Sequence, residues 1–273
     1  MQVVLIGSGN IATIFGQRLA AAGHTIGQVM SRNAAHAEEL ASVLGCPWTD
    51  SMATLNREGE AYILAVSDPA VYEMAAGLRL GHALVVHTAG AVSREVLQPV
   101  SSRYGVLYPL QSIRKEVGFP PRIPLLIDAS GDEGRSGEDT CSADEAWEQV
   151  RSLAGAISDW VRPAGDEQRL RLHVGAVFVN NFPNYLYTLT EAYLKEEANL
   201  NEQPVDFSYL LPLLQETVRR LETYSPAQVM TGPAYRGDVT TIAQHEALLA
   251  GHPEMLEWYK LFTERIMAMY RKD

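Results

Sequence analysis

The sequence predicts an α/β domain with a doubly wound, mostly parallel sheet, followed by an all-α domain. Over the first 130 residues, short aliphatic and β-branched runs alternate with helical stretches. A glycine-rich turn follows the first of these runs directly. After Pro163 the strand patterns stop, and amphipathic helical patterns continue to the C-terminus. These observations predict an α/β domain at residues 1–163 and a helical domain at residues 164–273.

The elements of the first domain follow one another closely. Predicted helices cover residues 10–22 and 34–44, and Gly23 and Gly45 end them because glycine readily adopts the left-handed conformation of a helix C-terminus. Ser67-Asp68-Pro69 supplies cap residues and a first-turn proline for a third helix. Predicted strands cover residues 3–6, 25–30, 61–66, 84–87 and 105–108. This alternation is typical of a parallel sheet with helices on both faces.

The far edge of the sheet is expected to gain strands at residues 123–127 and 160–161. Between them, residues 130–142 are rich in Gly, Ser, Asp and Glu, which is typical of a solvated loop. A helix is expected to follow at about residues 143–154.

Apolar stripes with helical spacing characterise the second domain. They comprise Leu210, Leu211, Leu214, Val218 and Leu221, and then Leu256, Tyr259, Phe262, Ile266 and Met269. A bundle of about 110 residues cannot readily bury so many stripes on its own. We therefore predict a homodimer joined through the helical domain, with two-fold symmetry.

Composition narrows the classes of partner. Lys and Arg number 22 against 33 Asp and Glu, and the formal net charge of −11 disfavours binding to nucleic acids and anionic membranes. No apolar run approaches the roughly 20 residues that cross a bilayer, and no signal-peptide pattern precedes the first strand. Cys46 and Cys141 lack neighbours at metal-ligand spacing. We expect a cytoplasmic protein that binds no nucleic acid, membrane or metal.

The strongest motif is the turn after the first strand, formed by Gly7, Ser8, Gly9, Asn10, Ile11 and Ala12. The first glycine permits a tight turn, the second lets the backbone approach a pyrophosphate, and the small Ala12 allows close helix–strand packing. N–H groups at the helix N-terminus would bind the anion. The alternative is a turn without a ligand. A strand before the motif and a helix after it favour dinucleotide binding.

The end of the second strand distinguishes between dinucleotides. NAD sites usually carry an acidic residue here for the ribose 2′-hydroxyl, whereas this chain has Ser31-Arg32-Asn33. Arg32 can pair with a 2′-phosphate, and Ser31 and Asn33 can hydrogen-bond it. Alternatively, Arg32 is only solvated and Asn33 only caps the second helix. The missing acid and the arginine together favour NADP.

Further motifs carry a resemblance to a known family. They are His87-Thr88-Ala89-Gly90, Tyr108-Pro109-Leu110-Gln111-Ser112, residues 177–182 and residues 232–238. With the glycine-rich turn, they resemble bacterial NADP oxidoreductases that have a Rossmann-like domain and a C-terminal domain of unknown function. These proteins are related to pyrroline-5-carboxylate reductases and β-hydroxyacid dehydrogenases. The resemblance implies a helical domain like that of 6-phosphogluconate dehydrogenase and a site completed by it, often across a dimer interface.

Ligands of open α/β sheets bind outside the carboxyl ends of the strands. Among residues at or just after the ends of predicted strands, we assign Val66, Ser67, Asp68 and Thr88 to cofactor binding, and Gln111 and Ser112 to substrate binding. His87 can exchange a proton near neutral pH, so it is a catalytic candidate. The alternatives are a buried structural histidine and a simple turn after Pro109.

The helix after the domain boundary is mostly apolar yet carries His173, Asn181 and Asn184. At 100° per residue, His173 and Asn184 fall about 20° apart, with Asn181 about 60° further round. Pro183 should kink this helix. In the related dehydrogenases, the equivalent helix supplies a general acid and a substrate-holding amide, roles that the resemblance gives to His173 and Asn181. The alternative is hydrogen bonding between helices, and the lysine acid of those dehydrogenases is missing here.

Arg236 lies in a break between helices, where its planar guanidinium could bind a substrate anion. Asp238 can cap the following helix, and a purely structural contact between the two is the alternative. We assign Asn184 and Arg236 to substrate binding.

Together these features favour an NADP-dependent oxidoreductase that moves hydride to or from a small polar carbonyl, imine or hydroxy compound. A non-catalytic NADP-binding sensor with the same fold is the alternative, because a fold does not determine a function. A deazaflavin-linked reductase is a third possibility.

Overall fold

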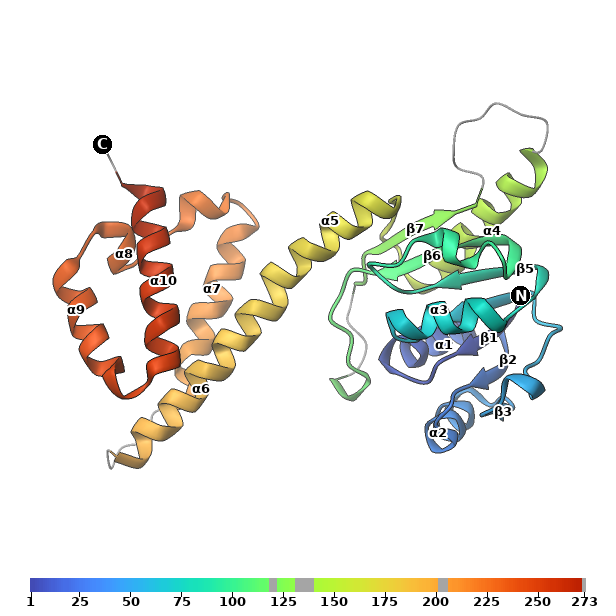
Figure 1. The fold of residues 1–273 in the computed structure, drawn as a ribbon, viewed down its shortest axis with the longest axis horizontal. Helices are drawn as coiled ribbons and strands as arrows, with labels where there is room; N and C mark the ends of the chain where they lie inside the picture. Colours follow the sequence, from blue (N-terminus) through green and yellow to red (C-terminus); the bar gives the residue numbers. More distant parts are fainter. Residues whose placement is uncertain (118–121, 131–139, 201–205, 272–273) are drawn as a thin grey trace. The chain divides into compact units, whose positions relative to one another are not determined.

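The structure, a computed structural model, describes residues 1–117, 122–130, 140–200 and 206–271 (Figure 1). The chain forms two compact units, Met1–Asn180 and Asn181–Asp273. The predicted boundary after Pro163 lies three residues before the helix α5 (Asp166–Ala176), which is part of the first unit. The division into a cofactor-binding domain at residues 1–163 and a domain for substrate binding and dimerisation at residues 164–273 stays a prediction.

An eight-stranded sheet in the order β3-β2-β1-β4-β5-β6-β7-β8 forms the centre of the first unit. Its strands are β1 (Gln2–Ile6), β2 (Thr25–Met30), β3 (Trp48–Thr49), β4 (Ala61–Leu64), β5 (Gly81–His87), β6 (Ser101–Pro109), β7 (Leu125–Ala129) and β8 (Val161–Pro163). Neighbouring strands are parallel except for β6 and β7. The predicted mostly parallel sheet is confirmed. Its order reverses between β1 and β4, where sheets of this kind bind ligands.

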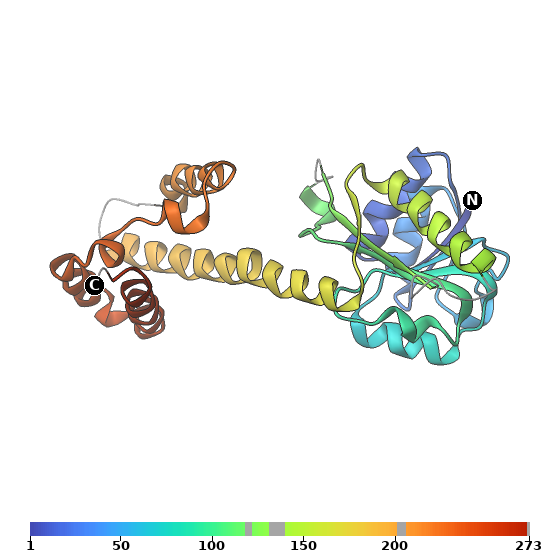
Figure 2. The ribbon, with the colours of Figure 1, turned by 90° about the horizontal axis from the view of Figure 1, so that it is seen from above.

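Helices cover both faces of this sheet, so the doubly wound arrangement is also confirmed (Figure 2). One face packs against α1 (Asn10–Ala21), α2 (Ala34–Leu44) and α4 (Thr140–Ile157). The other packs against α3 (Asp68–Gly77) and the 3-10 helix η2 (Arg94–Leu97). Gly45 ends α2 in the left-handed conformation, with φ +65°, as its position in the sequence predicts.

Some elements differ from the prediction. The strand expected at residues 123–127 lies at Leu125–Ala129 and pairs antiparallel with β6. The two-residue β3 is too short to show a periodic pattern and was not predicted. Helix α4 begins at Thr140, so the predicted loop 130–142 is too long at its C-terminal end. Residues 131–139 of that loop lie outside the described residues.

A π-helical turn, η4 (Val177–Asn181), separates α5 from α6 (Phe182–Leu200). Pro183 explains it, because a proline ring in a regular α-helix clashes with the carbonyl four residues earlier, that of Val179. A wider turn with i→i+5 hydrogen bonds relieves this clash, and Pro183 then lies in the first turn of α6. The rotation of 100° per residue assumed for His173 and Asn184 therefore does not hold across this stretch.

The described part of the second unit consists of helices, as predicted. After α6 come η5 (Phe207–Leu210), α7 (Leu211–Leu221), η6 (Pro226–Val229), α8 (Pro233–Arg236), α9 (Val239–Leu248), η7 (Leu249–Gly251) and α10 (Pro253–Tyr270). Helix α10 packs against α8 and α9, and its Trp258 meets Tyr185 of α6 edge to face, with ring centroids 6.5 Å apart. None of the described helices has the length and apolarity to cross a membrane.

Candidate functional site

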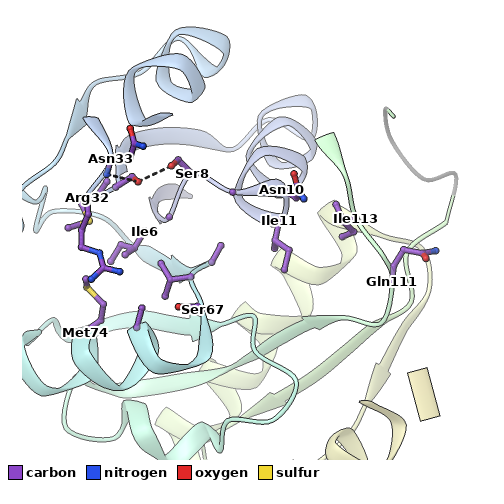
Figure 3. Close-up of a pocket in the computed structure, with 17 residues that line it drawn as sticks. Ile6, Ser8, Asn10, Ile11, Arg32, Asn33, Ser67, Met74, Gln111 and Ile113 are labelled. Atoms are coloured by element: carbon purple, nitrogen blue, oxygen red, sulfur yellow. Dashed lines mark hydrogen bonds between the residues drawn. The ribbon is translucent and has the colours of Figure 1, made fainter. Parts of the chain in front are cut away.

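A cavity of about 620 Å³ lies at the carboxyl ends of β1, β2 and β4 (Figure 3). Most of the predicted cofactor residues line it. The lining comprises Ile6, Gly7, Ser8, Gly9, Asn10, Ile11, Met30, Ser31, Arg32, Asn33, Ala65, Val66, Ser67, Ala70, Met74, Gln111 and Ile113. Ala12 is fully buried on α1 behind the turn, where its small side chain permits close packing.

The two glycines of the turn have different physical roles. Gly7 has φ +116°, and a Cβ there would lie 2.1 Å from the carbonyl oxygen of Ala65. Its conformation and its surroundings therefore both require glycine. A Cβ on Gly9 would meet no protein atom within 4 Å. Gly9 is also the N-cap of α1 and offers no side chain to its first N–H groups, so it leaves them open to an anion.

The end of β2 provides hydroxyl and guanidinium groups. The Ser8 hydroxyl donates to Ser31 Oγ at 2.8 Å, which ties the glycine-rich turn to β2 (Figure 3). Asn33 caps α2, since its Oδ1 accepts from the His36 N–H at 3.1 Å. The structural alternative for Asn33 is thus present, although its amide nitrogen can still donate. Arg32 Nη1 lies 3.3 Å from Oε2 of Glu73, and both side chains are exposed.

The other strand-end residues divide between the cavity and the core. Val66 and Ser67 line the cavity, and Asp68 begins α3. Thr88 is buried, and its N–H donates to the Leu64 carbonyl at 3.2 Å. Gln111, predicted for the substrate, lines the same cavity as the turn, and its Oε1 accepts from the N–H of the exposed Ser112.

Sequence reasoning missed the apolar lining of this cavity, including Met30, Ala70, Met74 and Ile113. Met30 directly precedes the Ser31-Arg32 pair, so its place at the end of a predicted strand could have identified it. The position of Ile113 depends on the path of the chain after β6, which no local pattern reveals.

His87 is fully buried at the end of β5. Burial, and next the charge of Arg169, lower the pKa of its imidazole to about 4. Its Nδ1 accepts from the Ala89 N–H at 3.2 Å, which ties the ring to the turn that follows β5. A neutral, enclosed imidazole is a poor proton donor at neutral pH, so this geometry favours the structural alternative.

A second histidine meets a tyrosine near the C-terminal end of β6. The hydroxyl oxygen of Tyr108 lies 2.8 Å from Nδ1 of His173, and the rings meet edge to face with centroids 5.8 Å apart. The loop after β5 passes tightly beside them, because a Cβ on Gly90 would lie 2.8 Å from His173 Nδ1 and 2.9 Å from Tyr108 Cζ. Burial, and next the charge of Asp68, raise the pKa of the Tyr108 phenol. Tyr108 was not singled out as a site residue from the sequence.

One turn before His173 on α5, Arg169 is almost completely buried. Its Nη2 donates to the Val92 carbonyl and to Oδ1 of Asp166, both at 2.6 Å. Its Nη1 lies 3.9 Å from Asp128 on β7, which also binds Arg94. These buried charges anchor the start of α5 to the sheet and so fix the segment that carries His173.

The predicted site residues of the second unit are exposed. They are Asn181, Asn184 and Arg236. Arg236, Tyr235, Tyr270 and Arg271 contribute to a cavity of about 750 Å³ within this unit. Asp238 caps α9 as predicted, since its Oδ1 accepts from the Thr241 N–H at 3.1 Å. The substrate roles of these residues stay predictions.

Comparisons with known proteins agree with this architecture. Residues 2–90 match the family model for coenzyme F420-dependent NADP oxidoreductases, and residues 140–266 match a domain of unknown function, DUF2520. A reductive aminase from Aspergillus terreus, solved with NADPH, has 16% identity and a TM-score of 0.68 over 99% of this chain and 94% of its own. A pyrroline-5-carboxylate reductase from Streptococcus pyogenes has 14% identity and a TM-score of 0.59 over 98% of each chain. At these identities the likeness concerns the fold. No curated protein is significantly similar to the chain.

One solved structure is much more similar in sequence. It is BF3122 from Bacteroides fragilis, described as a "putative NADP oxidoreductase", with 34% identity and a TM-score of 0.85 over 98% of both chains. This chain therefore belongs to the same NADP oxidoreductase family as the Bacteroides fragilis protein, with an N-terminal NADP oxidoreductase domain and a C-terminal DUF2520 domain.

Proposed function

We propose that the protein is an NADP-dependent oxidoreductase that transfers hydride to or from a small polar carbonyl, imine or hydroxy compound. The observation that carries the proposal is the cavity at the ends of β1, β2 and β4, which joins the glycine-rich turn to Arg32. The open space at Gly9 suits a pyrophosphate, and the cation at Arg32 suits a 2′-phosphate. Structures in complex with NADPH or NADP⁺ are known for the reductive aminase and for an imine reductase of this fold.

NADP would supply or accept the hydride. The protein would bind the cofactor and the substrate, orient them and supply the proton. The N–H groups at the start of α1 would hold the pyrophosphate, with Val66, Ser67, Asp68 and Thr88 as further cofactor contacts. In the reductive direction, hydride arrival leaves a developing negative charge or a basic nitrogen on the substrate, which needs a proton. His173 is our candidate for that donor.

The substrate is proposed to contact several uncharged groups and one cation. Asn181 would fix its orientation through the side-chain amide, and Gln111, Ser112, Asn184 and Arg236 would provide further hydrogen bonds. Because Gln111 lines the cavity of the glycine-rich turn, a contact with the cofactor is an equally good use of its amide.

We also propose a homodimer formed through the helical domain. The support comes from α7, where Leu211, Val218 and Leu221 of one apolar stripe are exposed. Such a stripe on a soluble helix normally marks an interface.

Binding and turnover assays test the function. Calorimetric titration with NADPH and NADH should give tighter binding of NADPH, and the oxidation of NADPH should be followed spectrophotometrically with a panel of carbonyls and cyclic imines. Tight NADPH binding without turnover of any panel member would favour a sensor. Binding of coenzyme F420 would favour the deazaflavin-linked alternative, since the matching family model describes NADP oxidoreductases that depend on coenzyme F420.

A further inference from the structure

We propose that Tyr108 is the positioning residue for His173. Its hydroxyl forms a hydrogen bond with Nδ1 of the imidazole, which leaves Nε2 as the atom that exchanges a proton with the substrate. This inference rests on the proposed function, in which His173 is the proton donor. It adds a residue that the sequence motifs alone did not assign to the site.

Three separate segments hold this pair together. Tyr108 is the penultimate residue of β6 and is only 8% exposed, whereas His173 lies near the end of α5. The hydroxyl-to-Nδ1 distance of 2.8 Å is that of a good hydrogen bond, and the edge-to-face contact, at 71° between ring planes, fixes the plane of the imidazole. Gly90 packs against both rings, because any Cβ there would come within 3.0 Å of each.

The lack of space at Gly90 restricts the geometry of the Tyr108–His173 pair. Gly90 is not among the glycines with positive φ, so its backbone conformation alone does not require glycine. The close approach to His173 and Tyr108 is instead the physical reason for a residue without a side chain. A glycine here allows the loop after β5 to hold the imidazole against the phenol.

The hydroxyl of Tyr108 can serve both protonation states of His173. Its pKa is raised, chiefly by burial, so the phenol keeps its proton at neutral pH. Toward a neutral imidazole, the phenol donates to Nδ1, and the ring proton is then on Nε2. Toward an imidazolium, the phenol oxygen accepts from Nδ1–H, and Nε2 again carries a proton.

The proton transfer itself balances without a tyrosinate. In the reductive direction, the Nε2–H bond of the imidazolium breaks and an O–H or N–H bond forms on the substrate atom that has gained electron density. The imidazolium becomes a neutral ring whose remaining proton stays on Nδ1, in a hydrogen bond to the Tyr108 oxygen. In the oxidative direction, this Nδ1–H ring accepts the substrate proton on Nε2. Exchange with water, which protonates Nε2 and removes the Nδ1 proton, returns the ring to its resting Nε2–H form, and the Tyr108 hydroxyl then turns to donate to Nδ1 while keeping its own proton.

Removal of the hydroxyl by Tyr108→Phe tests the inference. The matched control is Tyr104→Phe on the same strand, because Tyr104 is equally buried but donates its hydroxyl to Glu95 Oε2 at 2.6 Å. The first readout is the ¹⁵N NMR spectrum of the histidine rings in the full-length protein at neutral pH, with the His173 signals identified by their loss in His173→Gln. In the wild type, the neutral ring should have its proton on Nε2. Tyr108→Phe should give a mixture of tautomers, and Tyr104→Phe should leave the His173 signals unchanged.

The second readout is turnover with a substrate found in the panel. Tyr108→Phe should lower kcat about tenfold and His173→Gln about a hundredfold or more, with NADPH affinity changed less than about twofold in both. Unchanged His173 ring signals in Tyr108→Phe would overturn the inference whatever happened to turnover. Full turnover by His173→Gln would overturn the catalytic use of the pair. A failure of the wild type to bind NADPH would instead contradict the proposed function. Because the NMR spectra need no cofactor, failure of the proposed function can be distinguished from failure of the positioning role of Tyr108.

Discussion

The Nη1 atom of Arg94 lies 2.6 Å from Oδ1 of Asp128, and neither side chain is more than 8% exposed. The same guanidinium donates to the Ala129 carbonyl at 2.8 Å, and Arg169 approaches the other oxygen of Asp128 at 3.9 Å. One carboxylate thus compensates two buried cations from η2 and α5. This arrangement holds together the segments beside the Tyr108–His173 pair.

Asp128→Asn should be strongly destabilising, because it removes the buried carboxylate that both guanidinium groups share, and Arg94 and Arg169 then depend on the partly exposed Glu95 and Asp166. The expected loss is about 3–5 kcal/mol in the free energy of unfolding. Urea unfolding followed by circular dichroism measures it. The control is Glu167→Gln, which removes an exposed ion pair with Arg171 on α5 and should cost less than about 1 kcal/mol. Equal losses in the two variants would show that the buried carboxylate has no special role.

Gly7→Ala and Gly9→Ala should separate folding from cofactor binding. Gly7→Ala combines an unfavourable φ with overlap against Ala65, so we expect a loss of stability of about 2 kcal/mol or more. Gly9→Ala should leave stability within about 0.5 kcal/mol, because no protein atom lies near the new methyl group. It should nevertheless weaken NADPH binding at least about tenfold, since the methyl group would occupy the proposed pyrophosphate approach. Thermal unfolding and calorimetry measure these effects, and NADPH affinity of Gly9→Ala equal to that of the wild type would exclude a pyrophosphate at this turn.

Arg32 and Glu73 should have opposite effects on cofactor choice. Arg32→Asp removes the proposed partner of the 2′-phosphate and should weaken NADPH binding by about 2 kcal/mol or more while sparing NADH. Glu73→Gln should tighten NADPH binding by up to about fivefold, because Arg32 then does not have to break its ion pair with Glu73 to reach the 2′-phosphate. The gain is small because an exposed ion pair contributes little energy. Titration of both cofactors checks the pair of variants. Equal weakening of NADPH and NADH by Arg32→Asp would rule out the 2′-phosphate contact.

His87 should make the protein less stable in mild acid. Its folded-state pKa of about 4 lies below the unfolded value of about 6.5, so between these values the unfolded chain binds more protons. Stability is therefore complete above about pH 6.5 and is lost as the pH falls toward about 4, by up to about 1.4 kcal/mol per pH unit. His87→Asn cannot be protonated, and its Oδ1 can still accept from the Ala89 N–H. Urea unfolding at several pH values should give a shallower pH dependence for the variant, whereas identical slopes would show that His87 is protonated normally in the fold.

The proposed dimer gives a direct expectation for solution mass. The chain has a mass of 30.0 kDa, so light scattering at micromolar concentration should give about twice this value. Val218→Asp should lower the measured mass, because it places a charge on the exposed apolar stripe of α7. Gln215→Asp is the control, because Gln215 is exposed but lies about 90° round the helix from the middle of that stripe. A wild-type protein of monomeric mass would refute the dimer.

Local patterns in the sequence were sufficient to predict most of the fold. The strand–helix alternation, the glycine that ends α2 and the turn at Gly7 and Gly9 all concern neighbouring residues, whose conformations depend on side-chain periodicity and on φ. The change to helices after Pro163 has the same local origin. These patterns also located most of the cavity lining, because the carboxyl ends of parallel strands lie on one edge of a sheet.

Contacts between distant segments were decided only by the tertiary structure. Tyr108 and His173 are 65 residues apart, and whether they meet depends on how α5 packs beyond the end of β6. The burial that lowers the pKa of His87 and the pairing of Arg94 with Asp128 likewise depend on which strands are neighbours in the sheet. A residue's type shows that it can bond or ionise, whereas its partner and its solvent exposure are set by packing, and those two quantities determine its chemistry.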